Sequence, residues 1–157
     1  MSERVRNALF NTIGNEVKDA RVLDVFAGSG SIGLEAVSRG AAHATFIEKD
    51  RVATKIIEAN IALVGAGEET SLVKAPVASW LDTYKGEPFD LIIADPPYTD
   101  LQLSTVFRLM GLLTSNGLMV LSYPGRGEAP TANGVVVVDN RSYGTAALAY
   151  YRKKSVL

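Results

Sequence analysis

The chain has 157 residues, a length that suits one domain with a substantial buried core. Its net charge of −1 does not indicate a nucleic-acid-binding protein, and the absence of cysteine excludes disulfides, thiolate metal sites and a cysteine nucleophile. No apolar run reaches the roughly 18 residues of a membrane span, and residues 1–6 lack an apolar signal core, so we expect a cytoplasmic protein. His43 is the sole histidine, so we expect no metal site and a structural role for this residue.

Residues 3–13 carry apolar side chains at intervals of four, which predicts a short amphipathic lead-in helix that ends at Gly14. The residues of this stripe are Val5, Leu9 and Ile13. Arg4 and Arg6 lie off the stripe, so they face either a ligand or water.

A glycine-rich turn follows the first predicted strand, residues 22–26. Its residues 27–30, Ala-Gly-Ser-Gly, let the backbone turn tightly and approach a ligand, and the helix that follows presents unpaired N–H groups. A second strand, residues 43–47, ends in Glu48. Glu48 lies 20 residues beyond Gly28, the spacing at which a strand-end carboxylate meets ribose hydroxyls. The pattern predicts a nucleoside-binding site.

The nature of that nucleoside depends on Asp24. Gly28, Gly30, Gly33 and Glu48 formally match a dinucleotide fingerprint, but a pyrophosphate needs an anion-friendly cradle. Asp24 lies four residues before Gly28 and would repel a pyrophosphate, whereas it would attract the ammonium group of an amino acid. S-adenosylmethionine has such a group, a ribose and no phosphate, so Asp24 favours this cofactor over NAD. A glycine-rich turn without a ligand is the remaining alternative.

The middle of the chain continues the alternation of helix and strand. Asp50 caps a predicted helix whose apolar positions repeat as on a buried face, and Gly65 ends it. These apolar positions are Val52, Ile56, Ala59 and Leu63. A short strand over residues 71–74 then leads into a helix with Pro76 in its first turn, and we expect Trp80 in the core.

An apolar strand over residues 91–94 ends abruptly in Asp95, Pro96, Pro97 and Tyr98. Strands buried on both faces belong to parallel sheets, whose ligands bind beyond the carboxyl ends of the strands. The two prolines make a stiff, extended corner with carbonyls free to accept hydrogen bonds. Asp95 and the Pro96 carbonyl can each accept one N–H of a planar amine, while Tyr98 stacks on the ring that carries it. The alternative is a plain strand end with Tyr98 partly buried.

The last third of the chain completes an α/β pattern. A helix is predicted over residues 101–113 and a fifth strand over 118–123. Residues 124–133 form a polar loop, which is a lid, a substrate contact or a plain connection. Residues 135–138 and 146–151 are two strands with no helix between them, which predicts an antiparallel hairpin at the sheet edge. We therefore predict a single domain over the whole chain, with a three-layer, doubly wound, mostly parallel seven-stranded sheet.

Four motifs, in this order and spacing, resemble those of class I S-adenosylmethionine-dependent methyltransferases. They are Asp24-Val-Phe-Ala-Gly-Ser-Gly, Glu48-Lys-Asp, Asp95-Pro-Pro-Tyr and Arg141-Ser-Tyr-Gly-Thr. Over nearly its whole length, the lead-in helix included, the chain more closely resembles the RsmD family of 16S ribosomal RNA guanine-N2 methyltransferases. The resemblance implies a Rossmann-like methyltransferase fold and methyl transfer to a guanine amine. It implies ribosomal RNA or the small ribosomal subunit as the partner.

The resemblance also implies roles for individual residues. The implied S-adenosylmethionine-binding residues are Asp24, Phe26, Ala27, Gly28, Ser29, Gly30, Glu48, Lys49 and Val77. The implied catalytic residues, which bind the target amine, are Asp95, Pro96, Pro97 and Tyr98. The implied substrate side contains Arg141, Tyr143 and Gly144. Our further candidates for substrate binding are Arg4, Arg6 and Tyr123, the last as a ring that stacks on a base.

The sequence departs from the family pattern in three places. The family has a basic hairpin before the lead-in helix, whereas this chain begins at Met1 almost on that helix, so we expect weaker RNA affinity or a shortened chain. Pro76 stands where the family commonly has an acid for the adenine amine, so adenine relies on the Val77 backbone and apolar contacts. Ser122 and Tyr123 stand where the family has a glutamate after the fifth strand.

Three alternatives to guanine methylation remain open. A methyltransferase for another planar amine, such as adenine in DNA or RNA or a protein glutamine, would use a related tetrapeptide. A non-catalytic RNA-binding assembly protein on the same fold would not need the acids at Asp24, Glu48 and Asp95. An oxidoreductase would need a second domain opposite the nicotinamide. We expect a monomer.

Overall fold

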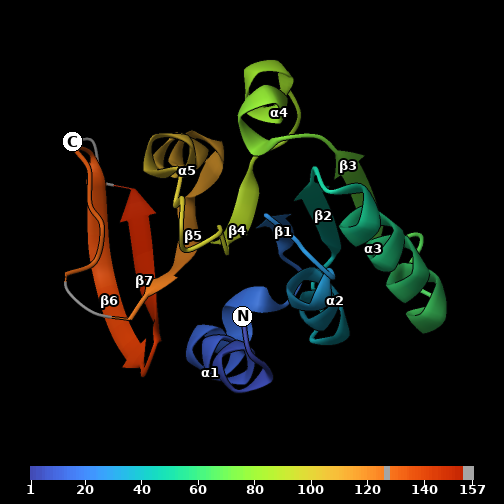
Figure 1. The fold of residues 1–157 in the computed structure, drawn as a ribbon, viewed down its shortest axis with the longest axis horizontal. Coiled ribbons are helices and arrows are strands. Elements are labelled where there is room, and N and C mark those ends of the chain that lie inside the picture. The colour runs from blue at the N-terminus through green and yellow to red at the C-terminus, as the bar shows by residue number, and fades with distance from the viewer. Residues whose placement is uncertain (126–127, 154–157) are drawn as a thin grey trace.

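The computed structural model describes residues 1–125 and 128–153, and in these residues the strands form one seven-stranded sheet (Figure 1). The strands are β1 (Arg21–Val25), β2 (His43–Glu48), β3 (Thr70–Lys74), β4 (Phe89–Ala94), β5 (Leu113–Pro124), β6 (Val135–Tyr143) and β7 (Ala146–Lys153). Their order is β3-β2-β1-β4-β5-β7-β6. Strands β1 to β5 pair in parallel, whereas β7 is antiparallel to both β5 and β6. The predicted fold class and its terminal hairpin are confirmed.

Helices cover both faces of this sheet, as Figure 1 shows. They are α1 (Glu3–Ile13), α2 (Ser31–Ser38), α3 (Arg51–Val64), α4 (Val77–Thr83) and α5 (Leu103–Arg108), with 3₁₀ helices over Gly14–Val17 and Leu109–Leu112. Leu9 of α1, Ala36 of α2 and Ile57 of α3 belong to the core on one face. Trp80 of α4 and Val106 of α5 belong to the core on the other face. The central strands are therefore buried on both sides, as their apolar runs predict.

Helix α3 turns the opposite face to the sheet from the one its sequence predicts. The side chain of Asp50 does cap the helix, accepting a hydrogen bond from the Ala53 N–H at 2.8 Å. However, Val52 and Leu63 of the predicted buried stripe are 68% and 83% exposed, whereas Ile57 is fully buried. Ile57 packs against the glycine turn, because a Cβ added at Gly30 would lie 3.3 Å from its Cγ1 atom. Helix α3 is apolar on two sides, so periodicity alone selected the wrong one.

Smaller differences concern the ends of elements. The helix predicted over residues 101–113 ends earlier, and Leu113 already pairs with Phe89 in the sheet. Pro76 is the N-cap of α4 and not part of its first turn. In the predicted loop 124–133, residues 126 and 127 lie outside the described part of the chain. No helix in the described part of the chain is long and apolar enough to cross a membrane.

The arrangement of β1 and β4 positions the candidate site. These two strands lie side by side in the middle of the sheet, and Val25 pairs with Ala94. Phe26 and Asp95 therefore leave the sheet next to each other, and the Asp95 N–H points to the Val25 carbonyl at 3.4 Å. Open α/β sheets bind ligands beyond the carboxyl ends of their strands, where the strand order reverses. The glycine turn and the proline corner meet at this point.

Candidate functional site

Strand β1 ends in a turn with positive φ angles. Phe26 has a φ of +57°, which is uncommon for a residue that carries a side chain, and Gly28 and Gly30 have φ angles of +58° and +79°. A Cβ added at Gly28 would find no atom within 4 Å, so a ligand can approach this part of the backbone. A Cβ at Gly33, by contrast, would collide with the ring of Phe46. Gly33 therefore serves helix packing, whereas Gly28 leaves space at the site.

Asp24 holds a buried carboxylate beside this turn. Its Oδ2 atom accepts a hydrogen bond from the Gly33 N–H at 3.0 Å, but its buried Oδ1 atom has no partner within residues 1–125 and 128–153. Burial raises the pKa of the Asp24 carboxyl well above its usual value, and the negative charges of Asp95 and Glu48 raise it further. A buried acceptor without a donor is costly, and a cationic ligand group would relieve that cost.

Glu48, at the end of β2, is held by two backbone groups. Its Oε1 atom accepts a hydrogen bond from the Gly28 N–H at 2.8 Å, and its Oε2 atom accepts one from the Asp50 N–H at 2.9 Å. The carboxylate thus fixes the glycine turn against the end of β2. Each oxygen retains a second lone pair, with which it can accept a hydroxyl hydrogen from a ligand.

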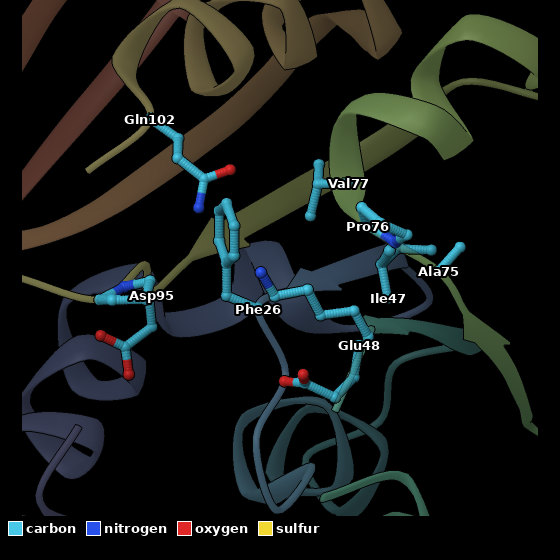
Figure 2. A pocket seen from close by; sticks show the side chains of 10 residues that line it. Phe26, Ile47, Glu48, Ala75, Pro76, Val77, Asp95 and Gln102 are labelled. Atoms are coloured by element: carbon cyan, nitrogen blue, oxygen red, sulfur yellow. The ribbon is translucent and has the colours of Figure 1, made fainter. Parts of the chain in front are cut away.

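The first of two pockets, here called the inner pocket, opens beyond β1, β2 and β4 (Figure 2). Its lining residues are Phe26, Ile47, Glu48, Lys49, Ala75, Pro76, Val77, Asp95, Pro97 and Gln102. Figure 2 shows the Phe26 ring near the middle, with Val77 and Pro76 to one side and the carboxamide of Gln102 directed toward the ring. Four predicted cofactor residues, Phe26, Glu48, Lys49 and Val77, meet here, while Ala27, Gly28, Ser29 and Gly30 form the adjoining turn. No sequence pattern marked Gln102 as part of this site.

The second pocket, here called the outer pocket, lies on the other side of Asp95. Its lining residues are Met1, Ser2, Arg4, Val5, Asp95, Pro96, Tyr98, Tyr143, Thr145 and Ala146. They come from the start of α1, the end of β4 and the turn between β6 and β7, where Gly144 has a φ of +78°. The ammonium group of Met1 donates to Asp95 Oδ2 at 2.8 Å. Asp95 therefore lines the outer pocket as well as the inner one.

Tyr98 presents its ring at the outer pocket. Its side chain is 41% exposed, and its hydroxyl forms a hydrogen bond of 2.6 Å with the hydroxyl of Ser122, which is fully buried in β5. Burial raises the pKa of Tyr98, so the hydroxyl stays protonated near neutral pH. The bond fixes the phenol end of the side chain and leaves the face of the ring to interact with a ligand. In the sequence, Ser122 stands out only as a departure from the family pattern.

Four predicted substrate residues line neither pocket: Arg6, Tyr123, Arg141 and Gly144, the last of which lies between two residues that line the outer pocket. The ring of Tyr123 is only 3% exposed and its hydroxyl donates to Asn140 Oδ1 at 2.6 Å, so the prediction that it stacks on a base is wrong for this structure. Arg6 lies 3.8 Å from a carboxylate oxygen of Glu35. Arg141 donates to an aspartate on its own strand at 2.8 Å. Within residues 1–125 and 128–153, no cluster of carboxylate and imidazole groups could hold a metal ion.

Comparison with known proteins identifies the family. A family model described as "Conserved hypothetical protein 95" matches residues 1–152. The chain belongs to the RsmD family. Ribosomal RNA small subunit methyltransferase D from Escherichia coli strain K12 is 40% identical over 116 residues, which cover 74% of this chain and 56% of that protein. This RsmD-family chain thus spans little more than half the length of that relative.

Solved structures confirm the fold of this RsmD-family chain. A conserved hypothetical protein from Streptococcus pyogenes is 33% identical, with a TM-score of 0.85 and 95% of each chain covered. A ribosomal protein L11 methylase from Lactobacillus delbrueckii subsp. bulgaricus is 22% identical, with a TM-score of 0.73, and the match covers 88% of this chain and 72% of that one. At this lower identity, the likeness shows only that the methyltransferase fold is shared.

Proposed function

We propose that this chain transfers a methyl group from S-adenosylmethionine to the exocyclic N2 amine of a guanine in small-subunit ribosomal RNA. The observation that carries the proposal is the place of Asp95, which lines both pockets and leaves the sheet beside Phe26. A carboxylate shared by two pockets can hold an acceptor amine against a donor. The Escherichia coli relative, a small-subunit ribosomal RNA methyltransferase by name, supports the choice of substrate.

The residues in and behind the inner pocket suit S-adenosylmethionine. Asp24 does not line the pocket, but it lies behind the glycine turn, and its buried Oδ1 atom, which has no hydrogen-bond partner among the described residues, suits the ammonium group of the methionine end. Glu48 can accept ribose hydroxyls, and Pro76 with Val77 offers an apolar wall for the adenine. When bound, the cofactor supplies a methyl group attached to a positively charged sulfur. The open side of Gly28 lets the cofactor lie close to the backbone.

Asp95 and Pro96 would orient the target amine. The lone pair of the guanine N2 atom is delocalised into the ring, so this nitrogen is a poor nucleophile. If Asp95 and the Pro96 carbonyl each accept one of its hydrogens, the nitrogen becomes more pyramidal and its lone pair points toward the inner pocket. Orientation of this kind contributes roughly 7–11 kcal/mol in favourable cases. Asp95 also stabilises the positive charge that grows on the nitrogen, whose proton then leaves to water.

Tyr98 and the outer pocket would hold the base. Chemistry on a base edge requires a base that is unpaired or flipped out of its stack, and aromatic side chains commonly stack on such bases. The ring of Tyr98 is held by Ser122 and half exposed at the outer pocket. Arg4, which lines the same pocket, supplies a positive charge for the RNA backbone.

A transfer assay with S-adenosylmethionine labelled on the methyl group tests this proposal. The purified chain is incubated in parallel with protein-free 16S ribosomal RNA, small ribosomal subunits, DNA and glutamine-containing protein, and the products are digested and separated. We expect label in N2-methylguanosine from the ribosomal samples. Label in N6-methyladenine or methylglutamine would instead support the rival amines. Cofactor binding without transfer to any sample would support a non-catalytic assembly protein.

A further inference from the structure

Gln102 is held in the inner pocket by an uncommon backbone conformation. In the described chain, three residues other than glycine have positive φ angles, and two of them, Phe26 at +57° and Gln102 at +50°, line the inner pocket. The third, Asp19, lines neither this pocket nor the outer one. Such conformations persist only where the surrounding structure enforces them, and they cluster at ligand sites. This observation singles out Gln102, which directly precedes α5.

The carboxamide of Gln102 is directed into the pocket and makes no hydrogen bond within the described residues. Its backbone groups are engaged: the N–H donates to Asp100 Oδ1 at 3.3 Å, and the carbonyl accepts from the Val106 N–H at 2.9 Å. Figure 2 shows the carboxamide pointing toward Phe26, across the pocket from Glu48. A group that offers both a donor and an acceptor is therefore exposed to any ligand in the inner pocket.

The other polar side chains of this pocket are less suited to read a neutral base. Glu48 already holds two backbone N–H groups, Lys49 is a cation and Asp95 is shared with the outer pocket. The wall made by Ala75, Pro76 and Val77 offers apolar side chains only. A glutamine carboxamide, by contrast, matches adenine, because it can accept from the N6 amine and donate to N7 at the same time.

We infer that Gln102 reads the amino edge of the cofactor's adenine, and so determines that the inner pocket takes an adenine nucleoside. The inference rests on the proposed S-adenosylmethionine site and assigns the choice of base to one residue. Gln102 contributes this selectivity through binding alone, and it takes no part in the transfer step.

Calorimetry with two ligands and three proteins tests this inference. The ligands are S-adenosylhomocysteine and its inosine analogue, in which an oxygen replaces the N6 amine. The proteins are the wild type, Gln102→Leu and the control Thr99→Ala, which changes an exposed residue of the same loop outside both pockets. We expect the wild type and Thr99→Ala to bind the adenine ligand roughly tenfold or more tightly than the inosine ligand, as a bidentate contact allows. We expect Gln102→Leu to bind both ligands almost equally.

Two results would overturn the inference. If Gln102→Leu lowers the affinity for both ligands by the same factor, or leaves both affinities unchanged, Gln102 does not read the amine. The proposed cofactor site would still stand in that case. If the wild type binds neither ligand, the proposed cofactor itself fails and the inference fails with it. A thermal shift of each protein with each ligand gives the same comparison by a second measurement, and it shows whether Gln102→Leu is folded.

Discussion

The inner and outer pockets share Asp95 but are built in different ways. The inner pocket is formed by the ends of adjacent parallel strands and the turns that follow them, and backbone N–H groups hold Glu48 in place. The outer pocket is formed by three segments that are distant in sequence, residues 1–5, 95–98 and 143–146. A pocket made by strand ends is pre-formed for one small ligand. A pocket made by converging loops and a helix end suits the irregular surface of a larger one.

The two pockets also differ in where they carry unsatisfied groups. Asp24, beside the inner pocket, keeps a buried oxygen that has no partner in the described part of the chain, and a cation bound there would remove the free-energy cost of that burial. In the outer pocket, the hydroxyl of Tyr98 is already bonded to Ser122. We therefore expect binding at the inner pocket to stabilise the fold strongly, and binding at the outer pocket to depend on ring stacking and charge.

The largest effect is expected for Asp95, where the two pockets meet. Asp95→Ala should lower methyl transfer by roughly 10²- to 10⁴-fold, because the amine loses the acceptor that orients it. Affinity for S-adenosylhomocysteine, measured by calorimetry, should change only severalfold. Asp95→Asn, which keeps the shape but adds donor hydrogens, is the matched control and should be similarly impaired. Unimpaired turnover in either variant would refute the role of Asp95.

Asp24→Asn separates ligand binding from stability at the inner pocket. The carboxamide oxygen can still accept the Gly33 N–H, but the charge that attracts an ammonium group is gone. We expect affinity for S-adenosylhomocysteine to fall roughly 30-fold or more, as when one partner of a buried charge pair is lost. Arg4→Ala, in the outer pocket, should leave this affinity unchanged. An equal loss of affinity in both variants would contradict the assignment of the cofactor to the inner pocket alone.

The same variant should change how stability depends on pH. Because burial raises the pKa of Asp24, the folded state holds this proton to a higher pH than the unfolded state does. The contribution of Asp24 to stability therefore falls as pH rises from about 4 through the raised pKa. Ligand-free Asp24→Asn does not lose stability in this way. Its Tm at pH 7 should therefore exceed that of the wild type, by roughly 2–4 °C for each kcal/mol of unfolding free energy that the buried charge costs. A lower Tm of Asp24→Asn at pH 7 would show that the charge of Asp24 does not destabilise the folded protein.

At the outer pocket, substitution of Tyr98 should raise KM for RNA more than substitution of Ser122 does. Tyr98→Ala removes a ring whose stacking on a base is worth roughly 1–3 kcal/mol, so KM for RNA should rise about 5- to 100-fold. Ser122→Ala loses one hydrogen bond and should raise KM only a few fold, with Ser122→Thr restoring it. Affinity for S-adenosylhomocysteine should stay at the wild-type value in all three. A larger effect for Ser122→Ala than for Tyr98→Ala would contradict this order.

The smallest effect is expected for Arg4. Arg4→Ala should weaken RNA binding a few fold and reduce the slope of log affinity against log salt concentration by about one, because one phosphate contact is lost. Arg108→Ala is the matched control, since Arg108 is on α5, pairs with Asp82 at 2.7 Å and lines neither pocket. If the slope of log affinity against log salt concentration is the same for both variants, Arg4 does not contact the RNA.

Sequence patterns predicted the inner pocket better than the outer one, for a physical reason. Glycines after a strand and a carboxylate at the end of the next strand are local signals, so Gly28 and Glu48 were assigned to one site, and a hydrogen bond joins them in the structure. Convergence of distant segments leaves no such signal, and Tyr123 was misplaced because burial of its ring depends on the packing of β5. Gln102 was missed since its place depends on a backbone turn with positive φ. No periodicity in the sequence marks that turn.

A crystal structure with S-adenosylhomocysteine tests the central claim most directly, namely that a donor in the inner pocket faces an acceptor held at Asp95. We expect the ammonium group of the ligand within hydrogen-bonding distance of Asp24 Oδ1, its ribose on Glu48 and its sulfur directed to the gap beside Asp95. A ligand whose sulfur points away from Asp95, or that leaves Asp24 unpaired, would contradict the account.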